Sequence, residues 1–354
     1  NPLVIKELRY IAEDLTAVSD VLKDYLHPGH AASLLDLLKE SRTPGELLAF
    51  LHKNGMPLQG DIEAFLGDLM AVCHKIHDTD HGEGYWSDHW TYNLDLLENY
   101  LAIYPENIAY ILFEKKSFSF HDSPYLVRPR NDKYVIWNGK TMQLEAVYHD
   151  KQKEALIQTR QQDRDSVRTQ FGSGEVYHTF LITKMLSLIT NKMASLDPSG
   201  IGVEMESDKP NWYDALNGLP AIMGSSLSET MEIKRNVDFL LRVINKHGQE
   251  IAYLEIFEEL GLFISTLGEI LANEPEPFSF WDQATSAKEK FRSQVILGIS
   301  GVETRLSISA LKAYLEACLR KLETGINRAW DNEGKIPSTY FNHEVVEYEL
   351  IQVK

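Results

Sequence analysis

The chain has 354 residues, and its 52 Asp and Glu outnumber its 35 Lys and Arg, which gives a formal net charge of −17. Apolar residues make up 44% and charged residues 25% of the sequence. This composition excludes global disorder, a collagen-like fibre and a disulfide-stapled scaffold. The acidic balance disfavours nucleic acids and anionic membranes as partners, because both require a basic surface.

Helical periodicity dominates the sequence from its beginning. Leu8, Ile11, Leu15, Val18 and Leu22 recur at spacings of three and four residues, which would place them on one helix face. Periodicity, together with start and stop signals, predicts helices near residues 3–26, 30–40, 43–54, 60–79, 89–103, 105–115, 150–168, 174–196, 226–247, 250–273, 280–297 and 304–328. The predicted fold is therefore mainly α.

The stretch at about 118–148 predicts a small antiparallel β insertion. Three short apolar runs, Tyr125–Val127, Tyr134–Trp137 and Leu144–Val147, are typical of strands. Asn138-Gly139, between the second and third runs, is a strong signal for a tight hairpin turn.

The tail at 339–353 is aromatic and β-branched, and predicts a further strand or two. A soft boundary at Asp78–Gly84 separates an N-terminal helical segment, 1–80, from a main domain, 81–354. No apolar run approaches the roughly 20 residues of a membrane span. Cys73 and Cys318 lie far apart in the sequence and could form one bridge, but two buried thiols in a reducing compartment are favoured, and we expect a cytoplasmic location.

The segment Gly200–Ser226 is the densest candidate for chemistry, because a loop of this length between long helices is usually functional. If two of its carboxylates share a dry pocket, their repulsion raises the pKa of one, which can then act as a general acid. Its aromatic side chains offer flat faces on which sugar rings pack. The alternative is an acidic, solvated loop. The candidate residues are Glu204, Glu206, Asp208, Trp212, Asp214 and Asn217.

The segment Gly82–Tyr92 brings four aromatic residues to the start of a predicted helix. Asp88 and His89, beside Trp86, would line a polar pocket shaped for a sugar. The alternative is a helix cap with aromatic packing, in which Ser87 or Asp88 is the capping residue.

Glycines that lead into a helix leave backbone N–H groups free for an anion. Gly172, Ser173 and Gly174, with His178, therefore form a candidate phosphate site ahead of the helix predicted at 174–196. Glycine before a helix is also common without any ligand.

The spacing of His74, His77 and His81 falls on one helix face, which is compatible with zinc. Surface histidines at a helix end are the favoured alternative, and we predict no metal site. In the tail, Glu344 is a candidate second carboxylate, with a plain β-strand as the alternative.

Four stretches together resemble the cellobiose-phosphorylase-like proteins: GYWSDHWTYNLDLLENYLAIYPE, LVRPRNDKYV, GSGEVYHTFLITK and LDPSGIGVEMESDKPNWYDALNGLPA. The most specific part is Trp212-Tyr213-Asp214-Ala215-Leu216-Asn217, which matches Trp-Asn-Asp-Gly-Met-Asn of the phosphorylases. Tyr213 and Ala215 depart from that pattern. The resemblance implies an (α/α) toroid of six helical hairpins, and it assigns the general acid to Asp214.

The resemblance further implies inverting cleavage of a β-glucoside, such as a cellobiose-like disaccharide, by phosphorolysis. No cofactor is implied, and inorganic phosphate is the expected co-substrate. Two alternatives remain: an inverting hydrolase in which Glu344 activates water, and a non-catalytic carbohydrate-binding or scaffolding fragment. We expect an oligosaccharide as the ligand, and the remainder of a larger polypeptide or a second copy of the chain as partner. Neither nucleic acid nor membrane is expected.

Overall fold

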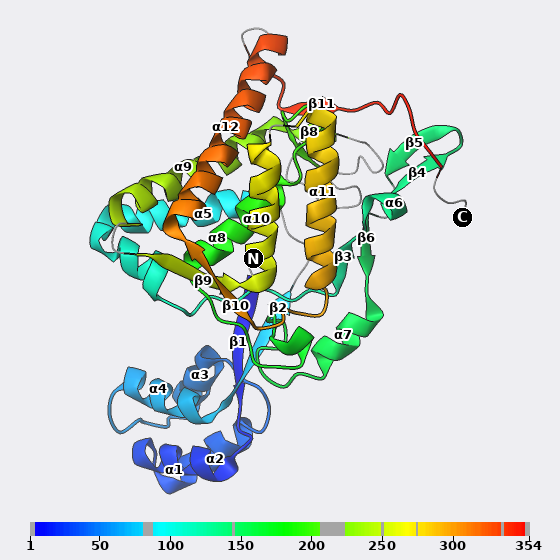
Figure 1. Ribbon diagram of the computed structural model, residues 1–354. Helices are drawn as coiled ribbons and strands as arrows, with labels where there is room; N and C mark the ends of the chain where they lie inside the picture. Colours follow the sequence, from blue (N-terminus) through cyan, green and yellow to red (C-terminus); the bar gives the residue numbers. More distant parts are fainter. Residues whose placement is uncertain are drawn as a thin grey trace. The chain divides into compact units, whose positions relative to one another are not determined.

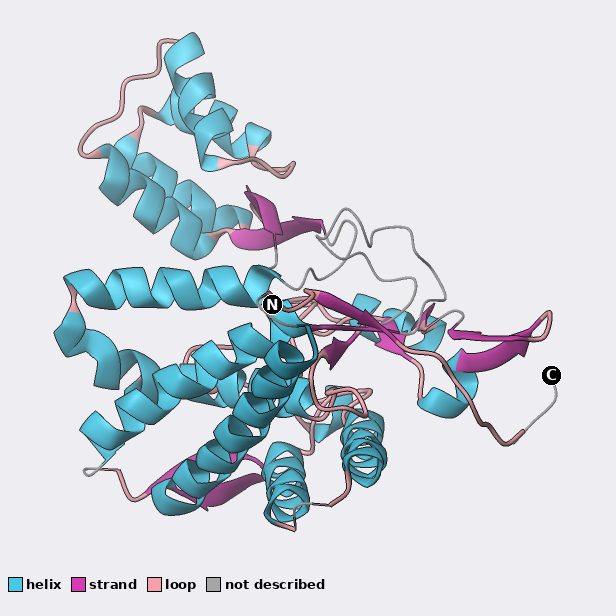
Figure 2. Ribbon diagram, turned by 90° about the horizontal axis from the view of Figure 1, so that it is seen from above, coloured by secondary structure: helices cyan, strands magenta, loops and turns pink. Residues whose placement is uncertain are grey.

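The computed structural model describes residues 4–80, 88–143, 146–205, 224–248, 251–273, 275–333 and 336–350. The chain divides into two compact units, Pro2–Glu83 and Gly84–Lys354. It is mainly helical, with strands gathered in small antiparallel sheets (Figures 1 and 2). Within the described residues, no helix is both long and apolar enough to span a bilayer.

The N-terminal unit packs short helices around an apolar core of its own. Leu22, Leu34, Leu47 and Phe65 are completely buried there. Side-chain caps start three of these helices, the clearest being the reciprocal capping box at the start of α3. The helices are α1 (Leu15–Tyr25), α2 (Pro28–Leu37), α3 (Pro44–Lys53) and α4 (Ile62–Val72).

Two helical predictions in this unit are wrong at their outer ends. Strands β1 (Val4–Ile11) and β2 (His74–Asp80) pair antiparallel, with Ile11 opposite His74. Asp14 has an extended backbone and caps the start of α1. The helix predicted at 3–26 therefore begins at Leu15, after strand β1. The apolar periodicity at Leu8 and Ile11 was misleading, because pairing with a distant strand overrides local preference.

The larger unit is built around a circuit of four long helices. Helix α8 packs on α9 and α10, and α12 packs on α9 and α10 in turn, while α11 lies against α10 (Figure 1). Leu186, Leu240, Leu267 and Leu315, one from each helix of the circuit, are completely buried. The helices are α5 (Asp88–Ile103), α6 (Arg130–Lys133), α7 (Lys151–Gln158), α8 (Leu181–Met193), α9 (Leu227–His247), α10 (Glu258–Ala272), α11 (Pro277–Gln294) and α12 (Ile308–Glu333).

Helices α10 and α12 each follow directly on a strand. The strands β9 (Tyr253–Phe257) and β10 (Glu303–Ser307) pair antiparallel, which corrects the predicted starts of the helices 250–273 and 304–328. Short turns connect the other elements: a 3₁₀ turn at Pro105–Asn107, a π turn at Tyr110–Glu114 and a 3₁₀ turn at Gln170–Gly172.

The β insertion is confirmed, with one change. Strands β4 (Tyr134–Trp137) and β5 (Lys140–Gln143) form the predicted hairpin, and Asn138 and Gly139 turn it with φ of 51° and 75°. Strands β3 (Tyr125–Val127) and β6 (Val147–His149) form a second pair. The third predicted strand is thus replaced by β5 and β6, and Leu144 and Glu145 lie outside the described residues.

The tail strand is also confirmed. Strand β11 (Tyr340–Asn342) pairs with β8 (Gly224–Ser226), which pairs with β7 (Val203–Glu204), so the sheet order is β11-β8-β7. The structure thus shows a mainly helical protein with small antiparallel sheets, and the closed toroid stays a prediction.

Candidate functional site

The sheet β7–β8 brings together the two ends of the predicted functional loop. The amide of Met205 donates to the carbonyl of Gly224 over 3.0 Å. Residues 206–223 lie outside the described part of the chain, as does Trp86. Five predicted site residues fall in that interval: Glu206, Asp208, Trp212, Asp214 and Asn217. The structure therefore shows the root of this loop, which is the sheet and the side chains packed beneath it.

Asp197 is the centre of the loop root. It lies between α8 and β7 and is completely buried. Its carboxylate accepts four hydrogen bonds, from the amides of Ile201 (3.1 Å) and Gly202 (3.0 Å) and from the hydroxyls of Ser199 (2.6 Å) and Ser225 (2.5 Å). These bonds satisfy a charge that burial alone would make costly.

His343 joins this carboxylate from the tail. It follows β11 directly, and its Nε2 lies 3.1 Å from Ser225 Oγ and 3.6 Å from Asp197 Oδ2. The His343 side chain keeps 29% of its surface exposed, whereas Asp197 keeps none. A carboxylate, a serine and a histidine thus meet at the root, although the sequence separates them widely.

Cationic groups approach the loop root from two helices. On α11, the buried Lys288 donates to Ser195 Oγ over 2.9 Å. On α12, the Lys321 ammonium lies 4.0 Å from the Phe280 ring centroid. Burial lowers the pKa of Lys321, the charge of Arg328 lowers it further, and Asp197 opposes both.

An aromatic side chain stands beside the first strand of the root. The Trp281 indole N–H donates to Glu204 Oε1 over 2.7 Å, and the Arg130 guanidinium lies 5.2 Å from the Trp281 ring centroid. The side-chain amide of Gln143 donates from Nε2 to the carbonyl of Met205 over 3.4 Å. The β insertion, which carries Gln143, is thus connected to the root.

Glycines allow the root to pack closely. A Cβ on Gly325 of α12 would lie 1.8 Å from the carbonyl oxygen of Gly200, and a Cβ on Gly224 would lie 1.9 Å from Tyr340 Oη. Only hydrogen at these positions permits the observed approach of α12 and β11.

The predicted phosphate segment is built differently from the expectation. Helix α8 begins at Leu181, so the predicted helix 174–196 starts seven residues later than expected. The amides of Gly172, Ser173 and Gly174 donate to backbone carbonyls of Thr169 and Gln170. These N–H groups are occupied, which removes the physical basis for an anion site at this segment. His178 is exposed.

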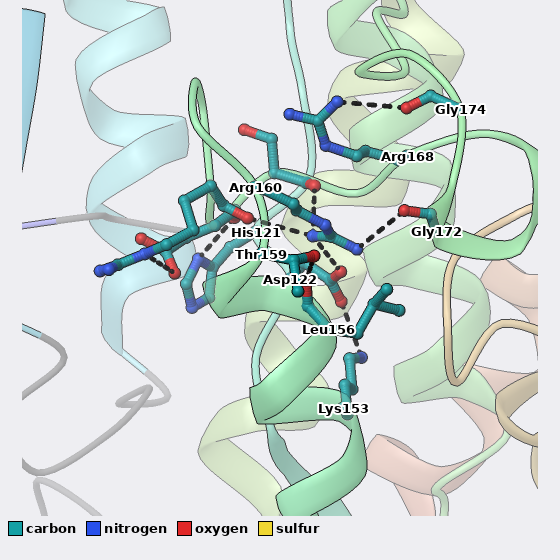
Figure 3. A network of polar contacts seen from close by, with 12 residues as sticks. His121, Asp122, Lys153, Leu156, Thr159, Arg160, Arg168, Gly172 and Gly174 are labelled. Atoms are coloured by element: carbon teal, nitrogen blue, oxygen red, sulfur yellow. Dashed lines mark hydrogen bonds and ion pairs between the residues drawn. The ribbon is translucent and has the colours of Figure 1, made fainter.

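Arginine side chains contact the backbone carbonyls of this same segment, and one of these arginines belongs to a cluster of buried charges (Figure 3). Asp122 lies 2.7 Å from Lys153 Nζ and 2.8 Å from an Arg160 terminal nitrogen. Arg160 also donates to the carbonyl of Gly172 over 3.4 Å, and Arg168 donates to the carbonyl of Gly174 over 3.1 Å. The glycine segment therefore offers carbonyls to arginines rather than amides to an anion.

The helical geometry proposed for zinc is not present. His74 and His77 lie on β2, and His81 lies outside the described residues. His74 Nδ1 is 3.8 Å from Glu13 Oε2. In the described part of the chain, no group of three or more His, Cys, Asp or Glu side chains could hold a metal ion.

Other predicted site residues are placed only in part. Asp88 and His89 begin α5, but their side chains lie outside the described set. Glu344 is exposed, whereas the preceding His343 is half-buried. Burial alternates from Phe341 to Val346, as in an extended segment, so Glu344 points away from the face that contacts Ser225. Its role as a base stays a prediction.

A cavity of about 430 Å³ lies elsewhere, between α5 and α9. It contains none of the predicted site residues. Glu98 on its wall already pairs with Arg235 (2.6 Å) and Arg242 (3.3 Å). The described residues of its wall are mostly apolar and include one carboxylate, that of Glu98. The lining residues are Glu98, Leu101, Ala102, Ile108, Phe239, Arg242, Val243, Lys246 and His247.

No family model matches the chain, and no curated protein matches it. Asp197, Ser225, His343 and Trp281 of the loop root were not among the predicted site residues. The turn-forming run Asp197-Pro198-Ser199-Gly200 was the available signal, since Asp beside Pro, Ser and Gly favours turns in which the carboxylate accepts backbone N–H groups.

Proposed function

We propose that this chain is a carbohydrate-active enzyme, or the catalytic part of one, that cleaves a β-glucoside with inversion by phosphorolysis. One observation carries the proposal. The stretch Trp212–Asn217, which resembles the acid-bearing motif of the phosphorylases, lies between two strands joined by the bond from Met205 to Gly224. The second of these strands, β8, is held by the buried carboxylate of Asp197, which accepts a hydrogen bond from Ser225.

In this mechanism, Asp214 protonates the glycosidic oxygen as it leaves, and inorganic phosphate attacks the anomeric carbon from the opposite face. Trp212 packs on a sugar ring, while Glu206, Asp208 and Asn217 bind its hydroxyls. Trp86, Asp88 and His89 are further candidates for binding the sugar. The phosphate contacts are not assigned to Gly172, Ser173 and Gly174, because their amides are occupied.

The chain requires no cofactor in this scheme, and a (α/α) toroid would supply the funnel around the site. A cytoplasmic location agrees with the free, buried Cys73 and Cys318. If water replaces phosphate, the second carboxylate, for which Glu344 is the candidate, must lie roughly 6.5–9.5 Å from the acid.

The test compares the wild-type chain with Asp214→Asn on a panel of β-linked glucose disaccharides, with and without phosphate. We expect sugar 1-phosphate from the wild type only when phosphate is present, and none from the variant. Circular dichroism checks that the variant is folded. Phosphate-independent glucose release would instead support the hydrolase, and oligosaccharide binding without turnover would support a non-catalytic module. Turnover by the folded variant at the wild-type rate would remove Asp214 from the mechanism.

A further inference from the structure

We infer that Asp197, Ser225 and His343 form a hydrogen-bond relay with a fixed direction. His343 Nε2–H donates to Ser225 Oγ, and the Ser225 hydroxyl donates to the Asp197 carboxylate. The relay makes His343 a positioning residue for strand β8. Its kinetic consequence rests on the proposed function, whereas its hydrogen-bond direction does not.

The direction follows from counting donors. Asp197 already accepts from the amides of Ile201 and Gly202 and from Ser199 Oγ, so its oxygens act as acceptors. Ser225 has a single O–H, and its oxygen lies 2.5 Å from Asp197 Oδ2, the distance of a hydroxyl donating to a carboxylate. Ser225 can then only accept from His343. The Nε2 atom, at 3.1 Å, must therefore carry hydrogen.

This arrangement differs from that of a serine nucleophile. A nucleophilic serine gives its proton to histidine, and the carboxylate holds the far side of the imidazole. Here the carboxylate accepts the hydrogen bond of the serine hydroxyl directly, and Ser225 is completely buried. Ser225 is consequently a connector that lies beyond the reach of a substrate.

The relay joins three segments that are distant along the chain. Asp197 belongs to the turn that leads into β7, Ser225 lies in the central strand β8, and His343 follows β11. The next residue after Ser225, Ser226, caps α9 by accepting from the Glu229 amide. A shift of β8 would therefore move both the start of α9 and the described end of the segment that carries Asp214.

The first test measures the imidazole of His343 directly by long-range ¹H–¹⁵N correlation NMR on the full chain. We expect the neutral ring to carry its hydrogen on Nε2, and we expect its signals to move in Ser225→Ala. A neutral ring protonated on Nδ1, with a bare Nε2, would overturn the relay. This measurement requires no substrate.

The second test separates positioning from bulk stability. His343→Gln keeps an N–H donor for Ser225, and His343→Leu removes it. His52→Leu makes the same apolar change at an exposed position of the other unit. On the best substrate of the panel, we expect His343→Leu to lower kcat about tenfold with little change in KM, and His343→Gln to stay within about threefold of the wild type.

Equal kcat for His343→Leu and the wild type, or equal losses in His343→Leu and His343→Gln, would overturn the positioning role. Thermal unfolding of all three variants identifies a loss that comes from unfolding. If the wild type turns over no substrate, the proposed function fails, and the NMR measurement still decides the relay.

Discussion

Two buried carboxylates of the larger unit are satisfied in opposite ways. Asp122 is 1% exposed and faces two cations, Lys153 at 2.7 Å and Arg160 at 2.8 Å (Figure 3). Asp197 is completely buried, and its hydrogen-bond donors among the described residues are neutral hydroxyls and amides, with His343 at 3.6 Å. An aspartate is thus the centre of an ion triad at Asp122 and the final acceptor of a hydrogen-bond relay at Asp197.

The difference shows which region tolerates change. Removing the charge of Asp122 leaves two buried cations without a counter-charge, which is the costly way to break an ion pair. Removing the charge of Asp197 strands neutral donors, each of which costs less. We therefore expect the Asp122 triad to tolerate loss of its carboxylate charge less well than the Asp197 relay does.

The largest expected effect on stability comes from breaking the Asp122 triad. We predict that Asp122→Asn lowers the free energy of unfolding by about 3–5 kcal/mol, because Lys153 and Arg160 remain buried without a counter-charge. Urea unfolding measures the change. Asp36→Asn, which breaks an exposed pair with Lys39, is the matched control and should change little. A loss for Asp122→Asn no larger than that of the control would contradict the triad.

Asp197→Asn should cost less, roughly 2–3 kcal/mol, because the amide keeps one acceptor oxygen while its NH₂ faces former donors. The same urea titration gives the value. If Asp197→Asn proved more destabilising than Asp122→Asn, the comparison between neutral and ionic partners would be reversed.

Close packing at the root predicts a third effect. Gly325→Ala would place its Cβ 1.8 Å from the carbonyl oxygen of Gly200, and overpacking of this kind costs about 1–3 kcal/mol. Gly67→Ala in α4 meets no atom within 4 Å and is the control. It should stabilise the chain slightly, since Ala favours a helix over Gly by about 1 kcal/mol. Thermal unfolding of both variants measures the two effects. A stabilising effect of Gly325→Ala would disprove the close approach of Gly325 to Gly200.

The two cysteines give the smallest effect and report on each unit separately. Burial raises the pKa of Cys73 to about 11 and that of Cys318 to about 12. Because both pKa values exceed that of an unfolded thiol, each group favours the folded state at neutral pH, and this contribution falls as the pH rises above about 9.

We therefore predict that neither thiol reacts with a thiol reagent at pH 8 in the folded chain. Each should react as its own unit unfolds in urea, Cys73 with the N-terminal unit and Cys318 with the larger one. Mass spectrometry of labelled peptides follows both. Rapid labelling of Cys318 in the native chain would contradict its placement in the core.

Local signals in the sequence were sufficient where structure is local. The Asn138-Gly139 hairpin and most long helices were predicted because their determinants lie within a few residues of one another. Strands β1 and β2 were not, since each depends on a partner about 70 residues away. The relay is harder still, because Asp197 and Ser225 are 28 residues apart and Ser225 and His343 are 118 apart. No spacing rule connects such positions.

The most direct test of the proposed function is the anomeric configuration of the first product. The wild-type chain is incubated with a β-linked glucose disaccharide and phosphate, and ¹H and ³¹P NMR follow the reaction from its start. Inverting phosphorolysis predicts that α-glucose 1-phosphate appears first and that Asp214→Asn produces none. Formation of β-glucose 1-phosphate, or no sugar phosphate from any disaccharide of the panel, would contradict the account.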